Sequence, residues 1–201
     1  TATKRNAHGL YYQWGRPTPI KKFGTTVSTY IPTSVEKDNL LKAIQSPDFI
    51  ISDSISIGNT SSQDWYSNTN QWITRWGNGT SDETSNKTPF DPCPQGWRMP
   101  GRKGSQPPWQ CLDLSNRSYS VDYSGYNFSD PGRTLGYYPI AGYRARSSGL
   151  LYDIGNIGSI WSSTPANNGG AQRILLDKKS ITPASRHYRA NGLSVRCVQD
   201  N

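Results

Sequence analysis

Hydrophobic and polar residues alternate over short stretches along most of the chain, and this period of two is typical of β-strands. The alternation, or a short apolar run closed by Gly or Pro, predicts strands in six segments: residues 8–16, 49–57, 133–146, 157–164, 171–181 and 192–198. A tight loop explains the first segment equally well. We expect a bend within the third and a hairpin turn near residues 177–179. The last segment is the clearest, because Leu193, Val195 and Cys197 share one face.

One segment, residues 34–45, has a helical period, with an N-cap candidate at Ser34 and Pro47 beyond its end. Its apolar residues fall roughly on one face: Val35, Leu40, Leu41 and Ile44. The polar segments 17–32 and 77–88 are predicted to be loops.

Aromatic residues supply much of the apolar content, because the 201 residues include seven Trp, twelve Tyr and four Phe. Such a chain can build a core, and its length fits one domain. We expect the tryptophans of residues 63–76, which form a short helix or a turn, to dock into that core. One Met argues against an all-α protein, and no apolar run could span a membrane. The chain begins at Thr1 without a signal peptide, so we expect a processed part of a longer protein.

The net charge is +8, from 22 basic and 14 acidic residues. The basic residues are scattered, and no nucleic-acid-binding motif occurs, so no nucleic-acid partner is expected. A solvated basic surface is the favoured interpretation, and an acidic partner is the alternative.

Motifs for catalysis and for metal binding are absent from the sequence. The three cysteines form no C-x-x-C pair, and the two histidines, His8 and His187, lie far apart. No nucleophile elbow, phosphate-binding loop or zinc-protease motif occurs, and no spacing selects a pair of carboxylates. We therefore expect no enzymatic activity and no cofactor, while calcium held by Asn- and Asp-rich loops stays open.

Five segments resemble, in their order and spacing, the family named for the Fibrobacter succinogenes major paralogous domain. They are Gly9–Arg16, Asp91–Pro100, Gly142–Arg144, Trp161–Thr164 and Gly192–Val198. The Cys-Pro-Gln-Gly-Trp-Arg-Met-Pro and Ser-Val-Arg-Cys-Val pieces are the specific ones. The resemblance implies a single α+β domain of C-type-lectin-like fold, with a mostly antiparallel twisted sheet, one or two helices and long loops. Two features depart from the family: the acidic residue expected before Trp109 is missing, and so is a strand before Gly9.

The resemblance implies a binding module on an exported surface protein, such as a fimbrial tip subunit or a surface lipoprotein. A phage tail tip is an alternative location. Its ligand would be a protein or a glycan, and other pilus subunits are further candidate partners. An enzyme related to formylglycine-generating proteins and a structural pilus subunit are the alternative functions.

Some members of this family are diversified by retroelements that rewrite adenines near the end of the gene. The residues Ala184–Tyr188 can each be reached from an Asn codon, AAC, by changing its adenines alone. They precede Arg189-Ala190-Asn191-Gly192, which resembles the fixed end of such a segment. The resemblance thus implies a diversified loop before the last strand, with an ordinary polar loop as the alternative.

We expect the ligand-binding face to combine this loop with the outward side of the arm at 171–181 and with an Asn-rich turn. Its predicted residues are Asn167, Asn168, Gly169, Arg173, Leu175, Asp177, Thr182, Ala184, Ser185, Arg186, His187 and Tyr188. Leu175 is expected to be exposed, whereas Ile174, Leu176 and Ile181 should face the core.

The three cysteines allow one disulfide and one free thiol if the protein is exported. Two prolines hold the segment around Cys93 rigid, and Cys197 lies on the core-facing side of the last strand. We therefore predict a bond between Cys93 and Cys197, with Cys111 buried and reduced.

Overall fold

The structure of the chain is a computed structural model. It describes residues 8–20, 27–31, 37–52, 64–66, 74–77, 87–102, 109, 112–122, 124–130, 133–166 and 170–200. The predicted sheet-rich fold is confirmed, and helix content is low: the helical elements of these residues are α2 (Lys37–Gln45) and the 3-10 helix η1 (Leu114–Asn116). In the same part of the chain, no helix is both long enough and apolar enough to cross a membrane.

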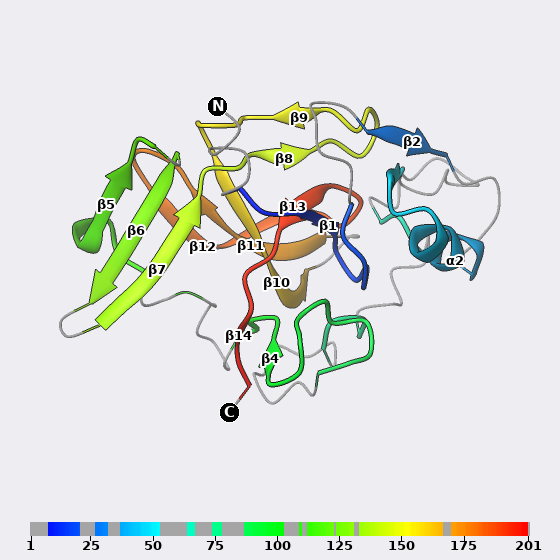
Figure 1. The fold of residues 1–201 in the computed structure, drawn as a ribbon, viewed down its shortest axis with the longest axis horizontal. Helices are drawn as coiled ribbons and strands as arrows, with labels where there is room; N and C mark the ends of the chain where they lie inside the picture. The colour runs from blue at the N-terminus through cyan, green and yellow to red at the C-terminus, as the bar shows by residue number, and fades with distance from the viewer. Residues whose placement is uncertain are drawn as a thin grey trace.

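A seven-stranded sheet forms the centre of the molecule (Figure 1). Its strands are β1 (Tyr11–Gln13), β8 (Tyr143–Arg144), β9 (Leu151–Tyr152), β10 (Gly158–Ala166), β11 (Gly170–Leu176), β12 (Ile181–Tyr188) and β13 (Gly192–Ser194). The order across the sheet is β12-β11-β10-β13-β8-β9, and β1 pairs with β13. All pairs are antiparallel except β10 with β13. The strands predicted at 157–164 and 171–181, and the strand alternative for 8–16, are confirmed.

A three-stranded antiparallel sheet covers one face of the β10–β11 pair. It consists of β5 (Arg117–Ser120), β6 (Gly125–Asp130) and β7 (Arg133–Pro139), drawn in green at the left of Figure 1. Phe128 and Tyr138 of this sheet lie in one cluster with Ile160 and Ile174, and all four are buried. The pair predicted at 133–146 therefore exists as β7 and β8, but its two strands belong to different sheets.

Tryptophans fill the opposite face of β10. Trp14, Trp76 and Trp161 are almost fully buried in one cluster, and their indole rings are large apolar anchors. The indole nitrogen of Trp161 donates to the carbonyl oxygen of Tyr12 at 2.8 Å, and that of Trp14 donates to Ser162 at 2.8 Å. These bonds connect β10 to the β1 segment. Trp65 is also buried, as predicted, whereas Trp72 and most of 77–88 lie outside the described residues.

The N-terminal part adds α2 beside a parallel pair of short strands, β2 (Ser28–Tyr30) and β3 (Phe49–Ile51). The loop predicted at 17–32 is therefore wrong for β2, because pairing with the apolar β3 stabilises a strand whose own sequence is polar. The strand predicted at 49–57 is confirmed up to Ile51, and residues 53–57 lie outside the described part.

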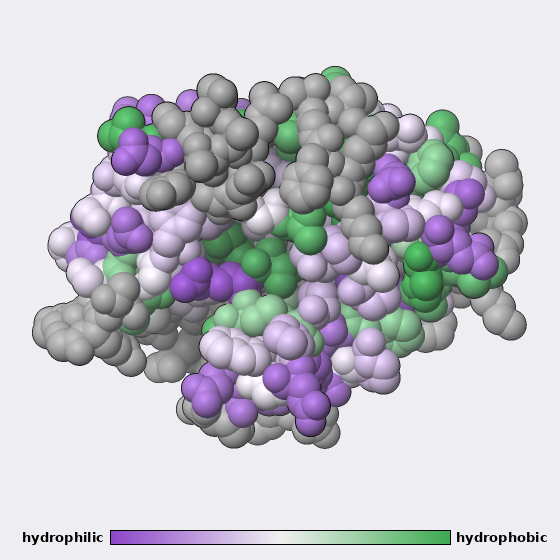
Figure 2. Space-filling model, in the orientation of Figure 1, coloured by the Kyte–Doolittle hydropathy of each residue, from purple (hydrophilic) through white to green (hydrophobic). Residues whose placement is uncertain are grey.

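The helix predicted at 34–45 is confirmed over 37–45, and its predicted apolar face is confirmed for Leu40, which packs against the core beside the fully buried Ala43. The predicted face is wrong for Leu41 and Ile44, which are about half exposed. A green patch lies over α2 at the right of Figure 2. The carbonyl oxygen of Ala43, near the end of α2, accepts from the guanidinium of Arg16 at 2.9 Å. Ser34 and Val35 lie outside the described residues.

The strand predicted at 192–198 is broken in two. β13 ends at Ser194, and β14 (Val198–Gln199) pairs instead with β4 (Trp97–Arg98). The guanidinium of Arg196 causes the chain to leave the sheet, since it donates to the carbonyl oxygens of Tyr137 at 2.6 Å and Leu135 at 3.2 Å.

The predicted disulfide between Cys93 and Cys197 is confirmed, with Cα atoms 5.7 Å apart. It attaches the β4–β14 pair to the tryptophan cluster, in which Cys93 is buried. Lys87 stabilises the same segment, because its ammonium group donates to the carbonyl oxygens of Cys93, Pro94 and Trp97. Cys111 lies outside the described residues.

Candidate ligand-binding face

The predicted loop before the last strand is in fact the edge strand β12. Among the described strands it pairs with β11 alone, from Leu176 opposite Ile181 to Gly170 opposite Tyr188. The polar composition of this segment did not indicate a strand, because an edge strand buries only one side and tolerates polar residues on the other. Pro183 fits the same position, since proline is accepted where one edge of a strand is unpaired.

Side chains alternate along β12 and β11. Thr182, Ala184 and Arg186 are exposed, and Ser185, His187 and Tyr188 are half-buried. On β11, Ile174 and Leu176 are buried as expected, and Ile181 packs against the same cluster. Arg173, Leu175 and Asp177 are each half-buried, so Leu175 is less exposed than expected. Asn167, Asn168 and Gly169 lie outside the described residues.

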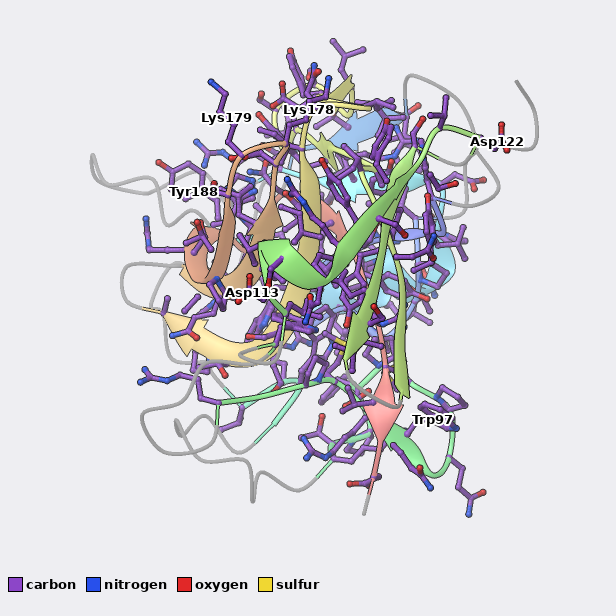
Figure 3. The ribbon with its side chains drawn as sticks, turned by 90° about the vertical axis from the view of Figure 1, so that its left-hand side faces the viewer. Trp97, Asp113, Asp122, Lys178, Lys179 and Tyr188 are labelled. Atoms are coloured by element: carbon purple, nitrogen blue, oxygen red, sulfur yellow. A yellow bond between two sulfur atoms is a disulfide. The ribbon has the colours of Figure 1, made fainter. Side chains whose placement is uncertain are left out.

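The predicted residues divide between the two ends of β12. Asp177 belongs to the hairpin end, where its carboxylate accepts from the backbone of Lys179 at 2.6 Å and Ser180 at 2.7 Å. These bonds hold the pKa of Asp177 below its usual value. Lys178 and Lys179, labelled in Figure 3, lie at this end, whereas Tyr188 is at the other end of β12, opposite Gly170.

The other end of β12 packs against a strand that is distant in the sheet order. The ring of His187 lies 5.1 Å from that of Tyr143 on β8 and 6.2 Å from that of Trp161 on β10. Three strands separate β12 from β8 in the order, but the turn after Tyr188 leads directly to β13, whose Gly192 lies opposite Arg144 of β8. The indole of Trp161 is buried at the base of this contact.

The environment of His187 keeps its ring neutral. Asn191 accepts a bond from the backbone N–H of Arg146 at 2.8 Å through its side-chain oxygen, so its amide nitrogen faces Nε2 of His187, 2.9 Å away. An amide nitrogen only donates, and Nε2 therefore accepts and carries no proton. Burial, followed by the charges of Arg173, Arg146 and Arg186, lowers the pKa of His187 to about 3.

Guanidinium groups and tyrosine rings surround this histidine. Arg146 lies 4.4 Å and Arg186 lies 5.4 Å from the ring centre of Tyr188, both within the range of cation–π attraction. Tyr143 stacks on Tyr152 of β9 with ring centres 5.8 Å apart. We name this group the arginine–tyrosine cluster: Tyr143, Arg146, Tyr152, Arg173, Arg186, His187 and Tyr188.

The sequence pattern predicted Arg173, Arg186, His187 and Tyr188 but not the members from the β8–β9 hairpin, which are Tyr143, Arg146 and Tyr152. Gly142-Tyr143-Arg144 was available as a motif, yet nothing in its spacing connects it to β12. The turn from β12 to β13 and the pairing of β13 with β8 bring these segments together.

Immediately after the cluster the chain becomes fully buried. The guanidinium of Arg189 pairs with Asp64 at 3.0 Å and lies 4.7 Å from the ring centre of Trp14. Ala190 and Leu193 are also inaccessible to solvent. Exposed positions in β12 are thus followed directly by residues that the core fixes.

No group of three or more His, Cys, Asp or Glu side chains that could hold a metal ion occurs in the part of the chain that the structure describes. The cluster offers hydrogen-bond donors, aromatic faces and positive charge, a combination suited to binding. Comparison with models of known protein families found no match. Comparisons with curated proteins and with solved structures likewise found none.

Proposed function

We propose that this protein is a ligand-recognition domain of C-type-lectin-like fold, carried on the surface of a bacterium. The arginine–tyrosine cluster and the exposed residues of β12 are its binding face. The observation that carries the proposal is the change in burial after Tyr188. The side chains of β12 are wholly or partly accessible to solvent, whereas residues 189–194 are buried. The resemblance of the motifs to the family named for the Fibrobacter succinogenes major paralogous domain supports the same function.

The chemistry of the cluster suits recognition. Tyr and Arg are the residues in which binding hot spots are enriched, and here they lie on strands rather than on long loops. Strands hold such side chains with little loss of conformational entropy when a ligand binds.

The same boundary supports diversification of the C-terminal segment by a retroelement. Thr182, Ala184 and Arg186 point to solvent, so their replacement leaves the core intact. Arg189 and Ala190 come next in the sequence and are buried. Their replacement would disturb the core, so a diversified segment would end before them.

Sequencing of the gene from independent isolates tests this part of the proposal. We expect substitutions at the codons of Thr182 and Ala184–Tyr188, confined to codons derived from AAC, and an unchanged segment from Arg189 to Arg196. Uniform sequences, or changes spread evenly over the domain, would contradict diversification.

Binding is tested with an array of bacterial and host glycans and a panel of intact cells, using the purified protein. We expect Arg186→Ala and Tyr188→Ala each to weaken the strongest interaction about tenfold, as for a hot-spot residue. Lys179→Ala, at the opposite end of β12, is the matched control and should bind normally. Retention of binding by both cluster variants would place recognition elsewhere.

A further inference from the structure

We infer that the arginine–tyrosine cluster and the neighbouring edge strand β9 form one interaction surface for a protein partner that presents carboxylates beside apolar side chains. This inference rests on the proposed function and adds the chemical class of the ligand. Two independent features support it, the charge of the cluster and the apolar rim of β9.

The charge of the cluster favours an anionic partner. Arg146, Arg173 and Arg186 all act electrostatically on His187, whereas Asp153 is the carboxylate that acts on Arg173 and Tyr143 in the described part of the chain. Guanidinium groups thus outnumber carboxylates there, and a guanidinium matches a carboxylate in a bidentate geometry. Arg173 donates to Ser159 through one terminal nitrogen at 2.8 Å, and its buried Nε has no hydrogen-bond partner among the described residues.

The rim of β9 favours a protein over a polysaccharide. Leu150, Tyr152 and Ile154 are 38%, 44% and 43% exposed, although large apolar side chains usually lie inside. Tyr152 belongs to β9, and Leu150 and Ile154 flank this strand in the chain. Tyr152 stacks on Tyr143 and so makes this rim continuous with the cluster. Aliphatic side chains gain most from burial against other apolar side chains, which proteins supply and sugars largely lack.

The exposed fractions of Leu150, Tyr152 and Ile154 leave this rim accessible. Among the described residues, β9 is the last strand of the sheet order and pairs with β8. A partner can therefore contact the side chains of β9 and the guanidinium groups of the cluster together. Tyrosines and arginines around an apolar centre also match the composition of protein interfaces.

A library of random peptides displayed on phage, selected on the immobilised full chain, tests the inference. We expect the selected peptides to be enriched in Asp and Glu next to Leu, Ile or Phe. Copies with Asn and Gln in place of the acids should bind about tenfold more weakly, and about 0.3 M NaCl should weaken the acidic peptides selectively.

Two double variants that remove the same charge from different parts of the surface locate the interaction. R146Q/R186Q should weaken the selected peptides about tenfold or more, whereas K178Q/K179Q removes the same charge at the far end of β12 and should change binding little. Leu150→Ser and Ile154→Ser should each weaken binding several-fold without altering its salt dependence. Thermal unfolding of every variant shows that a loss of binding is not a loss of fold, and the two serine variants provide a separate test if R146Q/R186Q unfolds.

The inference is overturned if no peptides are recovered, if they lack acidic residues, or if both charge variants bind them equally. It is also overturned if polygalacturonate, an acidic polysaccharide, binds the cluster more tightly than every selected peptide. In each of these cases the proposed recognition function still stands if Arg186→Ala and Tyr188→Ala abolish binding to a cell or a glycan.

Discussion

At the scale of single residues, the main finding is that several arginines are part of the core. The basic residues were interpreted from the sequence as a solvated surface, and this is wrong for Arg16, Arg75, Arg144 and Arg189, each at most 4% exposed. A buried guanidinium is tolerated when its donors are satisfied. Arg144 donates to the carbonyl oxygen of Gly149 at 2.9 Å, across the turn that joins β8 to β9.

Arg16 shows how much such a residue can stabilise. It donates to the carbonyl oxygens of Ala43 at 2.9 Å and Phe49 at 2.8 Å, and so binds the C-terminal end of α2 to β3. Burial lowers its pKa only to about 10, so it stays charged near pH 7.

We expect Arg16→Met to lower the free energy of unfolding by about 3 kcal/mol, because it removes charged donors from the carbonyl oxygens of Phe49 and Ala43, of which only the latter keeps the Thr18 hydroxyl as a donor in the described residues. Urea unfolding measures the loss. Arg98→Met is the control, since Arg98 makes an ion pair with the more exposed Asp200 and should cost less than about 1 kcal/mol. Equal effects of the two substitutions would show that Arg16 is dispensable.

His187 predicts a pH dependence of stability. Its folded-state pKa is about 3, whereas an unfolded histidine titrates near its ordinary value of 6.5. The unfolded state therefore binds more protons between these values, and the folded state loses stability as the pH falls from about 6.5. The loss attributable to His187 should reach about 2 kcal/mol at pH 5.

Two measurements check this prediction. Proton NMR should find the ring of His187 still neutral at pH 5, and the absence of its resonance in His187→Gln identifies it. The variant should also lose less stability between pH 7 and pH 5 than the natural chain. A His187 that titrates near 6.5 would show that its ring is solvated.

At the scale of elements, the hairpin β8–β9 requires a glycine at the start of β8. Gly142 has a φ of 67°, which residues with a Cβ rarely adopt, and a Cβ there would lie 1.9 Å from the carbonyl oxygen of Tyr152. That oxygen belongs to the backbone and cannot move without displacing β9. Gly155 has a similar φ of 77° but has open space around it.

We therefore expect Gly142→Ala to lower stability by at least about 3 kcal/mol, and Gly155→Ala by about 1–2 kcal/mol, the cost of the backbone conformation alone. Chemical denaturation of both variants measures the difference, which isolates the steric contact. If the two variants lose the same stability, β9 adapts to the extra methyl group.

At the scale of the whole molecule, the disulfide connects parts of the chain that are far apart in sequence. Cys93 and Cys197 are separated by 104 residues, and their bond joins the β4–β14 pair to the tryptophan cluster. A loop of this length strongly restricts the unfolded chain.

Reduction should thus lower the free energy of unfolding by about 4–5 kcal/mol in the chain-entropy description. Denaturant titrations with and without a reducing agent measure it, on protein produced in an oxidising compartment. Thiol counting on the unfolded, unreduced chain should give one free thiol, from Cys111. Three thiols, or equal stability in both conditions, would contradict a structural role of the bond.

The sequence by itself determined the local features of this protein. A short apolar run located β10, which is buried on both faces, and alternation located β11 and the hairpin that follows. The aromatic content predicted the tryptophan core, and the two prolines beside Cys93 helped to identify the disulfide. Four members of the arginine–tyrosine cluster were also named from the C-terminal segment alone.

The tertiary structure decided what depends on distant partners. β12 is a strand because β11 pairs with it, and the segment after Ser194 leaves the sheet where Arg196 bonds to β7. Tyr143 and Tyr152 join His187 through the pairing of β13 with β8 and of β8 with β9, which no local pattern encodes. The burial of Arg16 and Arg189 was equally unpredicted, because their guanidinium groups bond to Ala43, Phe49 and Asp64, which are remote in sequence.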